Sequence, residues 1–183
     1  MKTKIMKTPK AIAFTAIIFF AACSTETPQS VDVNSSEKVK PDQDTTADIV
    51  DVSFVDEMTG KAFQDYLKIE EALFNSDLSV ATKSAANLAE TFTTDQAELK
   101  ALANKMAESE ELETLRTHFF SFSKQSEDFF SDALSTGTIY KQYCPMAFDN
   151  EGAFWIAEIK EINNPYFGER MAHCGKTVEV ISK

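Results

Sequence analysis

The sequence predicts a mainly α-helical protein, an antiparallel four-helix bundle with a small C-terminal lobe of β-hairpin and loops packed on it. Between residues 61 and 134, apolar residues recur at spacings of three and four, which is the period of amphipathic helices. The same stretch contains no Pro and no Gly. A shorter segment follows with β-prone residues and four turn-forming residues: Gly152, Pro165, Gly168 and Gly175.

The N-terminus predicts export. "MKTKIMKTPK" carries four lysines, and the apolar run "AIAFTAIIFFAA" that follows has the length of a signal-peptide core and is too short to span a bilayer. The small residues before Cys23 resemble the lipobox of bacterial lipoprotein signals. This resemblance implies that residues 1–22 are cleaved and that the Cys23 thiol is lipidated. The alternative is an ordinary secretory signal with a chance cysteine.

The net charge argues against several partners. Cleavage changes the formal charge from −11 to −15, because the removed segment has four lysines and no acidic residue. So acidic a chain cannot neutralise phosphates, which argues against nucleic acid and against electrostatic docking on anionic lipid. We therefore expect membrane attachment only through acyl chains on Cys23, at the periplasmic face of the outer membrane or at the cell surface.

Residues 23–57 are predicted to be a flexible tether. They are rich in Ser, Thr, Asp and Pro, so they cannot bury enough apolar surface to offset the entropy of ordering. Only "DIVDVSFV" is a candidate for a short ordered segment. A single folded domain is expected over residues 58–183, with a helical part at 58–135 and a Cys/Met lobe at 136–183.

Four amphipathic helices are expected in the helical part. "NSD" breaks the first pattern, and Ser76 or Asp77 can cap the second helix. The short joints favour antiparallel neighbours, and the apolar stripes are rich in phenylalanine. The four stretches are residues 61–77, 78–92, 93–109 and 110–134.

The Cys/Met lobe is expected to hold two or three short strands. "TGTIYKQYCPMAF" and "KTVEVI" are β-prone, "DNEG" is a turn, and "NNPYFG" is a loop. "GERMAHCG" predicts a single helical turn that ends at Gly175. Because this lobe is too small to fold alone, we expect it to pack on the helices.

Two motifs in this lobe concentrate soft ligands. Cys144 and Met146 are two residues apart, so their sulfurs face one side of an extended backbone. Met171 and Cys174 share a face of a helical turn, and His173 lies between them. Soft sulfur ligands select Cu(I) above harder ions, and methionine is a poor ligand for zinc. The motifs therefore predict a site for Cu(I) or Ag(I).

A disulfide explains the same residues without a metal. In an oxidising compartment, the two cysteines that remain after acylation of Cys23 form a disulfide by default. Met146 and Met171 would then fill the core, and His173 would be exposed and idle. The aromatic residues of the lobe would be packing, whereas around Cu(I) they would exclude water and oxidant. Residue types alone leave both interpretations open.

His118 is a further candidate ligand. It lies in "LRTHFFSFS", one residue before the expected core position Phe119. A single histidine on a helix is usually a surface or boundary residue. It would be a ligand only if this helix faces the Cys/Met lobe.

The sequence predicts a binding protein and not an enzyme. It has no Ser-His-Asp spacing, no glycine-rich phosphate loop and no H-E-x-x-H motif. The two thiols of the lobe are separated by 29 intervening residues, whereas a thiol oxidoreductase typically uses C-x-x-C. The carboxylates are spread over helix faces, where charged side chains usually interact only with water.

Several stretches together resemble a known family: "LRTHFFSFS", "IYKQYCPMAF", Trp155, "EINNPYFGERMAHCG" and "VEVI". They resemble an uncharacterised bacterial domain of unknown function, over about residues 63–181. That family occurs alone in secreted proteins and lipoproteins of Bacteroidetes-type bacteria. It also occurs appended to the periplasmic adaptor subunits of copper/silver-type heavy-metal efflux pumps.

The resemblance implies a helical domain that handles copper or a related soft metal. It matches His118 to a histidine common on the family's "R-x-H-F" helix, and it places His173 in a variable position. The implied ligands at matched positions are Cys144, Met146, Met171 and Cys174.

Two functions are therefore expected, in different classes. The first is a lipid-anchored protein that buffers Cu(I) or Ag(I), or passes it to an efflux adaptor or pump. The second is a structural or protein-interaction module without metal, in which Cys144 and Cys174 form a disulfide.

Overall fold

The computed structural model describes residues 51–183. The predicted signal peptide, the lipid-attachment residue Cys23 and residues 23–50 of the predicted tether lie outside the described part. Within residues 51–183, no helix has both the length and the apolar character that a membrane span requires.

The first two helices begin at aspartate caps. α1 (Glu57–Phe74) starts after Asp56, and α2 (Leu78–Thr91) starts after Asp77. In each case the aspartate carboxylate accepts a hydrogen bond from a backbone N–H of the first turn, which would otherwise lack a partner. The caps explain why the helical period begins where it does in the sequence.

Two further helices complete the helical part. A short 3-10 turn, η1 (Thr94–Gln96), leads into α3 (Ala97–Ala107), and α4 (Leu112–Ala133) follows. Successive helices pack against each other, and α1 also contacts α4. Aromatic rings fill the space between α1 and α4, where Tyr66 stacks on Phe119 with ring centroids 4.9 Å apart.

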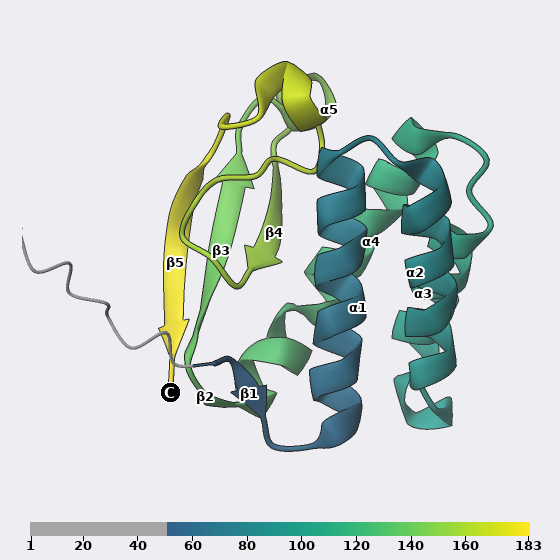
Figure 1. The fold of residues 1–183 in the computed structure, drawn as a ribbon, viewed down its shortest axis with the longest axis vertical. Coiled ribbons are helices and arrows are strands. Elements are labelled where there is room, and N and C mark those ends of the chain that lie inside the picture. The colour runs from purple at the N-terminus through teal and green to yellow at the C-terminus, as the bar shows by residue number, and fades with distance from the viewer. Residues whose placement is uncertain (1–50) are drawn as a thin grey trace, which may run out of the picture. The chain divides into compact units, whose positions relative to one another are not determined.

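A three-stranded antiparallel sheet lies beside the helices (Figure 1). Its strands are β3 (Thr138–Cys144), β4 (Ala153–Ala157) and β5 (Lys176–Ser182), in the order β4-β3-β5. The short α5 (Ala147–Asn150) connects β3 to β4, and the 3-10 turn η2 (Gly168–Met171) precedes β5. Both connections lie at the same end of the sheet as Cys144.

A second, two-stranded sheet ties the start of the domain to the end of α4. It pairs β1 (Ser53–Phe54) with β2 (Leu134–Thr136). The ring of Phe54 lies 5.0 Å, centroid to centroid, from that of Phe63. Residues 53–57 are thus structured, although they belong to the stretch predicted as tether.

The hydroxyl of Tyr66 joins α1 to both α4 and the sheet. It lies 2.7 Å from the hydroxyl of Ser123 and accepts a hydrogen bond from the backbone N–H of Ile156 at 3.1 Å. Since Ile156 is in β4, this buried contact satisfies a strand N–H that faces the helices. Burial raises the pKa of Tyr66 far above its ordinary value, so the hydroxyl stays protonated.

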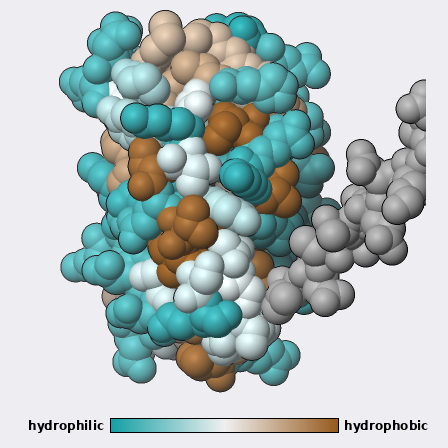
Figure 2. Space-filling view, turned by 90° about the vertical axis from the view of Figure 1, so that its left-hand side faces the viewer, coloured by the Kyte–Doolittle hydropathy of each residue, from teal (hydrophilic) through white to brown (hydrophobic). Residues whose placement is uncertain are grey.

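β5 forms an edge of the sheet and exposes two valines. The exposed fractions of Val178 and Val180 are 48% and 58%. Figure 2 shows the side of the domain on which the sheet lies, where apolar patches are separated by polar side chains. Apolar residues scattered in this way are ordinary on a protein surface.

The prediction of a mainly helical chain with a small antiparallel β region near its C-terminus is confirmed. The more specific antiparallel four-helix bundle stays a prediction. The expected helical turn at residues 168–175 is present only as η2, which ends at Met171.

Candidate functional site

Cys144 and Cys174 meet at one end of the three-stranded sheet. Cys144 is the last residue of β3, and Cys174 lies just before β5. The antiparallel pairing of Tyr143 with Lys176 brings the two segments side by side. The two Sγ atoms are 3.3 Å apart, and both cysteines are free. Cys144 is buried, whereas Cys174 is partly exposed.

The surroundings of Cys174 favour the protonated form of its thiol. The pKa of the Cys174 thiol is raised, first by its hydrogen bond with Cys144 and then by burial and the charge of Cys144. Reactive cysteines instead have a depressed pKa, because the thiolate is the nucleophile. Cys174 therefore does not have the electrostatics of an activated nucleophile.

Asn164 organises the loop that carries Cys174. Its side chain is fully buried, and its amide nitrogen donates to the carbonyl of Cys174 at 2.7 Å. Its side-chain oxygen accepts from the backbone N–H groups of Tyr166 at 2.9 Å and Phe167 at 3.3 Å. One side chain thus fixes both ends of residues 164–174.

Gly175 lets this loop approach the sheet closely. Its φ of 149° lies in the region that favours glycine. A Cβ at this position would lie 3.1 Å from the carbonyl oxygen of Tyr143, and 3.2 Å from side-chain carbons of Ile162 and Trp155. The backbone beside Cys174 is therefore packed tightly against β3 and the indole.

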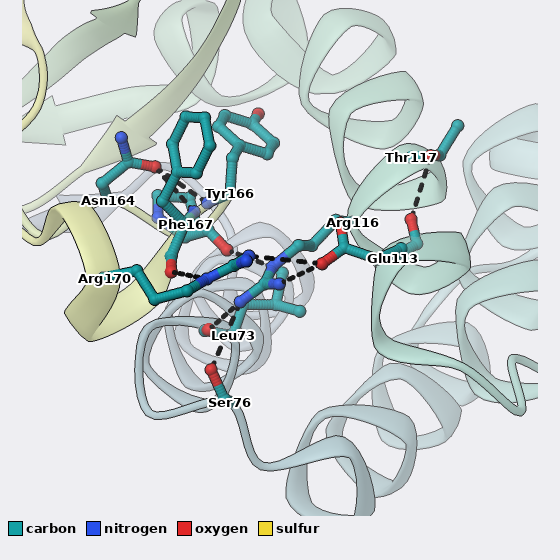
Figure 3. Close-up of polar contacts among 10 residues, drawn as sticks. Leu73, Ser76, Glu113, Arg116, Thr117, Asn164, Tyr166, Phe167 and Arg170 are labelled. Atoms are coloured by element: carbon teal, nitrogen blue, oxygen red, sulfur yellow. Dashed lines mark hydrogen bonds and ion pairs between the residues drawn. The ribbon is translucent and has the colours of Figure 1, made fainter. Parts of the chain in front are cut away.

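Arg116 anchors the same loop to the helices (Figure 3). It is buried on α4, and its Nε donates to the carbonyl of Pro165 at 2.9 Å. Its other nitrogens donate to the carbonyl of Leu73 at 3.1 Å and to the Glu113 carboxylate at 2.8 Å. One guanidinium thus connects the end of α1, α4 and the loop before η2.

The chain turns sharply after Cys144, contrary to the extended backbone expected there. Met146 has helical backbone angles, and its side chain is 46% exposed, whereas Cys144 is buried. Pro145 restricts the chain at this turn. The expectation of an extended backbone from Cys144 to Met146 is therefore corrected: the strand ends at the buried Cys144, and Met146 lies half-exposed in the turn that follows.

A left-handed turn follows the motif. Phe148, Asp149 and Asn150 all have positive φ, at 50°, 56° and 73°. Asp and Asn tolerate this conformation, but a phenylalanine there costs about 1–2 kcal/mol. Stacking of the Phe148 ring on Phe120, at 5.5 Å between centroids, offsets part of this cost.

His173 and Met171 lie on the same turn as Cys174. The backbone N–H of Cys174 donates to the carbonyl of Met171 at 3.0 Å. His173 is exposed, and its Nδ1 lies 2.9 Å from the carbonyl of Ile162. Because a carbonyl only accepts, Nδ1 carries the proton, and Nε2 of the neutral ring keeps a free lone pair. Metal-binding histidines commonly use this arrangement.

The structure does not bring His118 to the two cysteines. His118 is on α4 and lines a crevice with Lys105 and Glu108 of α3 and its C-terminal end. Burial lowers the pKa of His118, and the charge of Lys105 lowers it further. The face of α4 that meets the sheet lobe carries other residues, such as Phe120, whose ring contacts Tyr166.

The distance between the two thiols is compatible with two states, a disulfide and a metal ion bound by both sulfurs. A disulfide needs about 2.05 Å between sulfurs. Two thiolates that bind one ion at about 2.3 Å with a tetrahedral angle lie about 3.8 Å apart. The observed 3.3 Å lies between these values. No three His, Cys, Asp or Glu side chains within residues 51–183 converge as a metal site, so further ligands here would be thioethers or come from outside.

Asn164 and Arg116 were missed by the sequence-based prediction. The Asn-Pro dipeptide at residues 164–165 is a turn signal, and asparagine often bonds the backbone two residues on. That signal could have found Asn164. Arg116 carries no such signal, because its partners are far away in the sequence.

Comparison with known proteins covers mainly the helical part. A family model described as "Protein of unknown function (DUF3347)" matches residues 62–136. The matched residues include α2, α3 and α4, and they end before both cysteines of the site. No curated protein and no solved structure matches the chain.

Proposed function

We propose that this chain is a lipid-anchored, extracytoplasmic protein that binds one soft metal ion, Cu(I) or Ag(I), through Cys144 and Cys174. The observation that supports this proposal is the 3.3 Å separation of two free thiols from distant segments of the chain. Thiolates are soft ligands that prefer Cu(I) to harder ions. A partly exposed Cys174 beside a buried Cys144 gives the ion an entry side and an inner ligand.

The neighbouring methionines suit capture and release of the ion. Met146 is half-exposed beside the inner thiol, and Met171 is on the same turn as Cys174. Thioethers bind soft ions without a charge, so they can take the ion from a donor and give it up again.

Binding is linked to pH through the thiol protons. A metal ion must displace these protons, since the thiolate is the ligand. The raised pKa of Cys174 makes its proton harder to displace at neutral pH. Affinity therefore rises with pH until the thiols ionise.

The cellular role follows from the N-terminus and the family resemblance. The lipobox-like sequence before Cys23 supports anchoring, and the polar stretch after it supports a tether that lets the domain search for a partner. The resemblance to a domain of efflux adaptor subunits supports a partner of that kind. The protein would buffer the ion or pass it to an efflux system, without catalysing a reaction.

Anaerobic titration with Cu(I) against a competing chelator tests the proposal. We expect one tight equivalent for the wild type and none for the Cys144→Ser, Cys174→Ser double variant. The matched control is Cys23→Ser, which removes the third cysteine and should bind as the wild type does. Equal affinity of the double variant and the wild type would refute the proposed site.

The same geometry also favours the second function, a disulfide-stapled module. The sulfurs would have to approach by a little more than 1 Å to bond, in a compartment that is oxidising. Counting free thiols on protein isolated under native redox conditions separates the two functions. A quantitative disulfide that resists mild reductant would support the module.

A further inference from the structure

A cleft of about 500 Å³ lies between α1 and the segment that follows β4. This volume is in the range of small-ligand sites. The cleft has apolar walls from both sides and three carboxyl groups. The residues that carry the argument are Leu67, Phe74 and Ile159, and Glu70, Glu71 and Glu158.

Glu70 is a buried carboxyl group that lines this cleft without a cation. It is 8% exposed, and within residues 51–183 no lysine or arginine forms an ion pair with it. It lies beside the indole of Trp155, but the indole Nε1 has no hydrogen-bond partner in the described part of the chain. Buried polar groups of this kind are costly unless something pairs with them.

The surroundings of Glu70 add negative charge. Burial raises its pKa well above the ordinary value, and the charges of Glu158 and Glu71 raise it further, while the contact with Trp155 acts in the opposite direction. Lys68 also lines the cleft, but it is paired with Asp65 at 3.0 Å. Among residues 51–183, no positive charge is therefore paired with Glu70, the most buried acid of the cleft.

We propose that this cleft binds an organic cation, an ammonium or guanidinium group on an apolar body, with Glu70 as its counter-ion. The side chains of Leu67, Phe74 and Ile159 provide apolar contact for the body of the ligand. Hard cations such as Ca²⁺ take six or more oxygen ligands, whereas the acidic side chains of residues 51–183 do not converge in threes, so the cleft suits an organic cation better. Binding of the cation displaces the proton that Glu70 holds, and a single ammonium or guanidinium group supplies the one positive charge that the ionised carboxylate then needs.

The fluorescence of Trp155 provides a direct readout, because it is the only tryptophan of the chain. Metal-free full-length protein is titrated with benzylammonium and, separately, with the neutral analogue benzyl alcohol. We expect saturable binding of the cation, at least tenfold tighter than binding of the alcohol. Equal affinity of the two, or no saturable binding of the cation, would overturn the proposal.

Two variants test which residue supplies the negative charge and which residue supplies apolar contact in the cleft. Glu70→Gln should weaken benzylammonium binding at least tenfold, whereas Glu179→Gln, an exposed acid on β5, should leave it unchanged. Ile159→Ser changes a half-exposed residue at the rim, so it leaves the core intact and should weaken binding several-fold. Equal losses in Glu70→Gln and Glu179→Gln would indicate general charge attraction and contradict the proposal.

The cationic group that the cleft binds belongs either to a free amine or to a basic side chain of a partner protein. A second titration uses the peptide acetyl-Leu-Lys-Leu-amide, with norleucine in place of lysine as its control. Peptide binding that requires the lysine assigns the cleft to a partner's side chain, and benzylammonium binding alone assigns it to small amines. The Cys144→Ser, Cys174→Ser variant should bind both probes normally, so this test stands apart from the metal proposal.

Discussion

Glu70 is a largely buried carboxyl group, and no lysine or arginine of residues 51–183 forms an ion pair with it. Burial is the main reason that its pKa is raised, and the nearby charges of Glu158 and Glu71 add to the effect. The folded protein therefore binds a proton at Glu70 over a pH range in which the unfolded chain has lost it. At the scale of one residue, this makes stability depend on pH in the direction opposite to that of most carboxylates.

We predict that Glu70→Gln removes this dependence. Where the folded state binds more protons, the free energy of unfolding falls as pH rises, so the contribution of Glu70 declines from about its ordinary pKa of 4.5 upward. Urea unfolding of the wild type and of the variant between pH 4 and 8 measures this. The stability of the variant relative to the wild type should increase with pH. Parallel curves of the free energy of unfolding against pH would show that Glu70 does not cause this pH dependence.

Among the elements, the loop between β4 and β5 is the one whose position matters most for the site. It has little regular structure beyond η2, and its place depends on polar contacts. Asn164 holds it to the carbonyl of Cys174, and Arg116 holds it to α4 and the end of α1. Because no regular secondary structure beyond η2 fixes this loop, its individual polar contacts, together with the packing of Tyr166, decide how well the second thiol is positioned.

We predict that Arg116→Lys loosens this loop. Lysine keeps the charge, but its three donors sit on one nitrogen and cannot reproduce the planar fork by which Nε, Nη1 and Nη2 of Arg116 reach separate partners, so buried carbonyls lose partners. The free energy of unfolding should fall by about 2 kcal/mol, and Cu(I) should dissociate faster, as measured by urea unfolding and by chelator competition.

The matched control is Arg170→Lys. Arg170 contacts the same Glu113 carboxylate at 3.5 Å, but its side chain is 70% exposed. Such an exposed pair is worth little, so the change should be within about 0.5 kcal/mol. Equal losses in the free energy of unfolding for Arg116→Lys and Arg170→Lys would show that Arg116 does not anchor the loop.

In the whole domain, the site and the aromatic core are connected. Tyr166, from the Cys174 loop, packs its ring on Trp155 of β4 at 5.8 Å and on Phe119 of α4 at 6.2 Å, between centroids. Tyr66 links α1, α4 and β4 through its hydroxyl. Because these contacts span the helices and the sheet, an ion bound at the thiols should stabilise residues 51–183 as one unit.

We predict that Cu(I) raises the thermal unfolding temperature. A ligand at 100 times its dissociation constant stabilises the folded state by about 2.7 kcal/mol, which corresponds to roughly 10 °C for a domain of this size. Anaerobic differential scanning fluorimetry, with and without Cu(I), measures the shift. The Cys144→Ser, Cys174→Ser variant should show none, and an equal shift in that variant would place the ion elsewhere.

The sequence by itself determined the helical part and the mixed character of the C-terminal lobe. Both depend on local patterns: Asp77 caps its own helix, and apolar residues at spacings of three and four define each buried face. It also identified Cys144 and Cys174 as the chemically distinctive residues. It assumed an extended backbone through Met146, whereas the strand ends at Cys144 and the chain turns at Pro145.

Only the tertiary structure decided which distant groups meet. The two thiols lie 3.3 Å apart because β5 pairs with β3 in one register, and a shift of that register would separate them. Arg116 and Glu70 acquire their roles in the same way, from two carbonyls, an indole and the Glu158 carboxylate, which lie 40 or more positions away along the chain. No local pattern encodes such contacts, since they result from packing of the whole domain and not from the preferences of neighbouring residues.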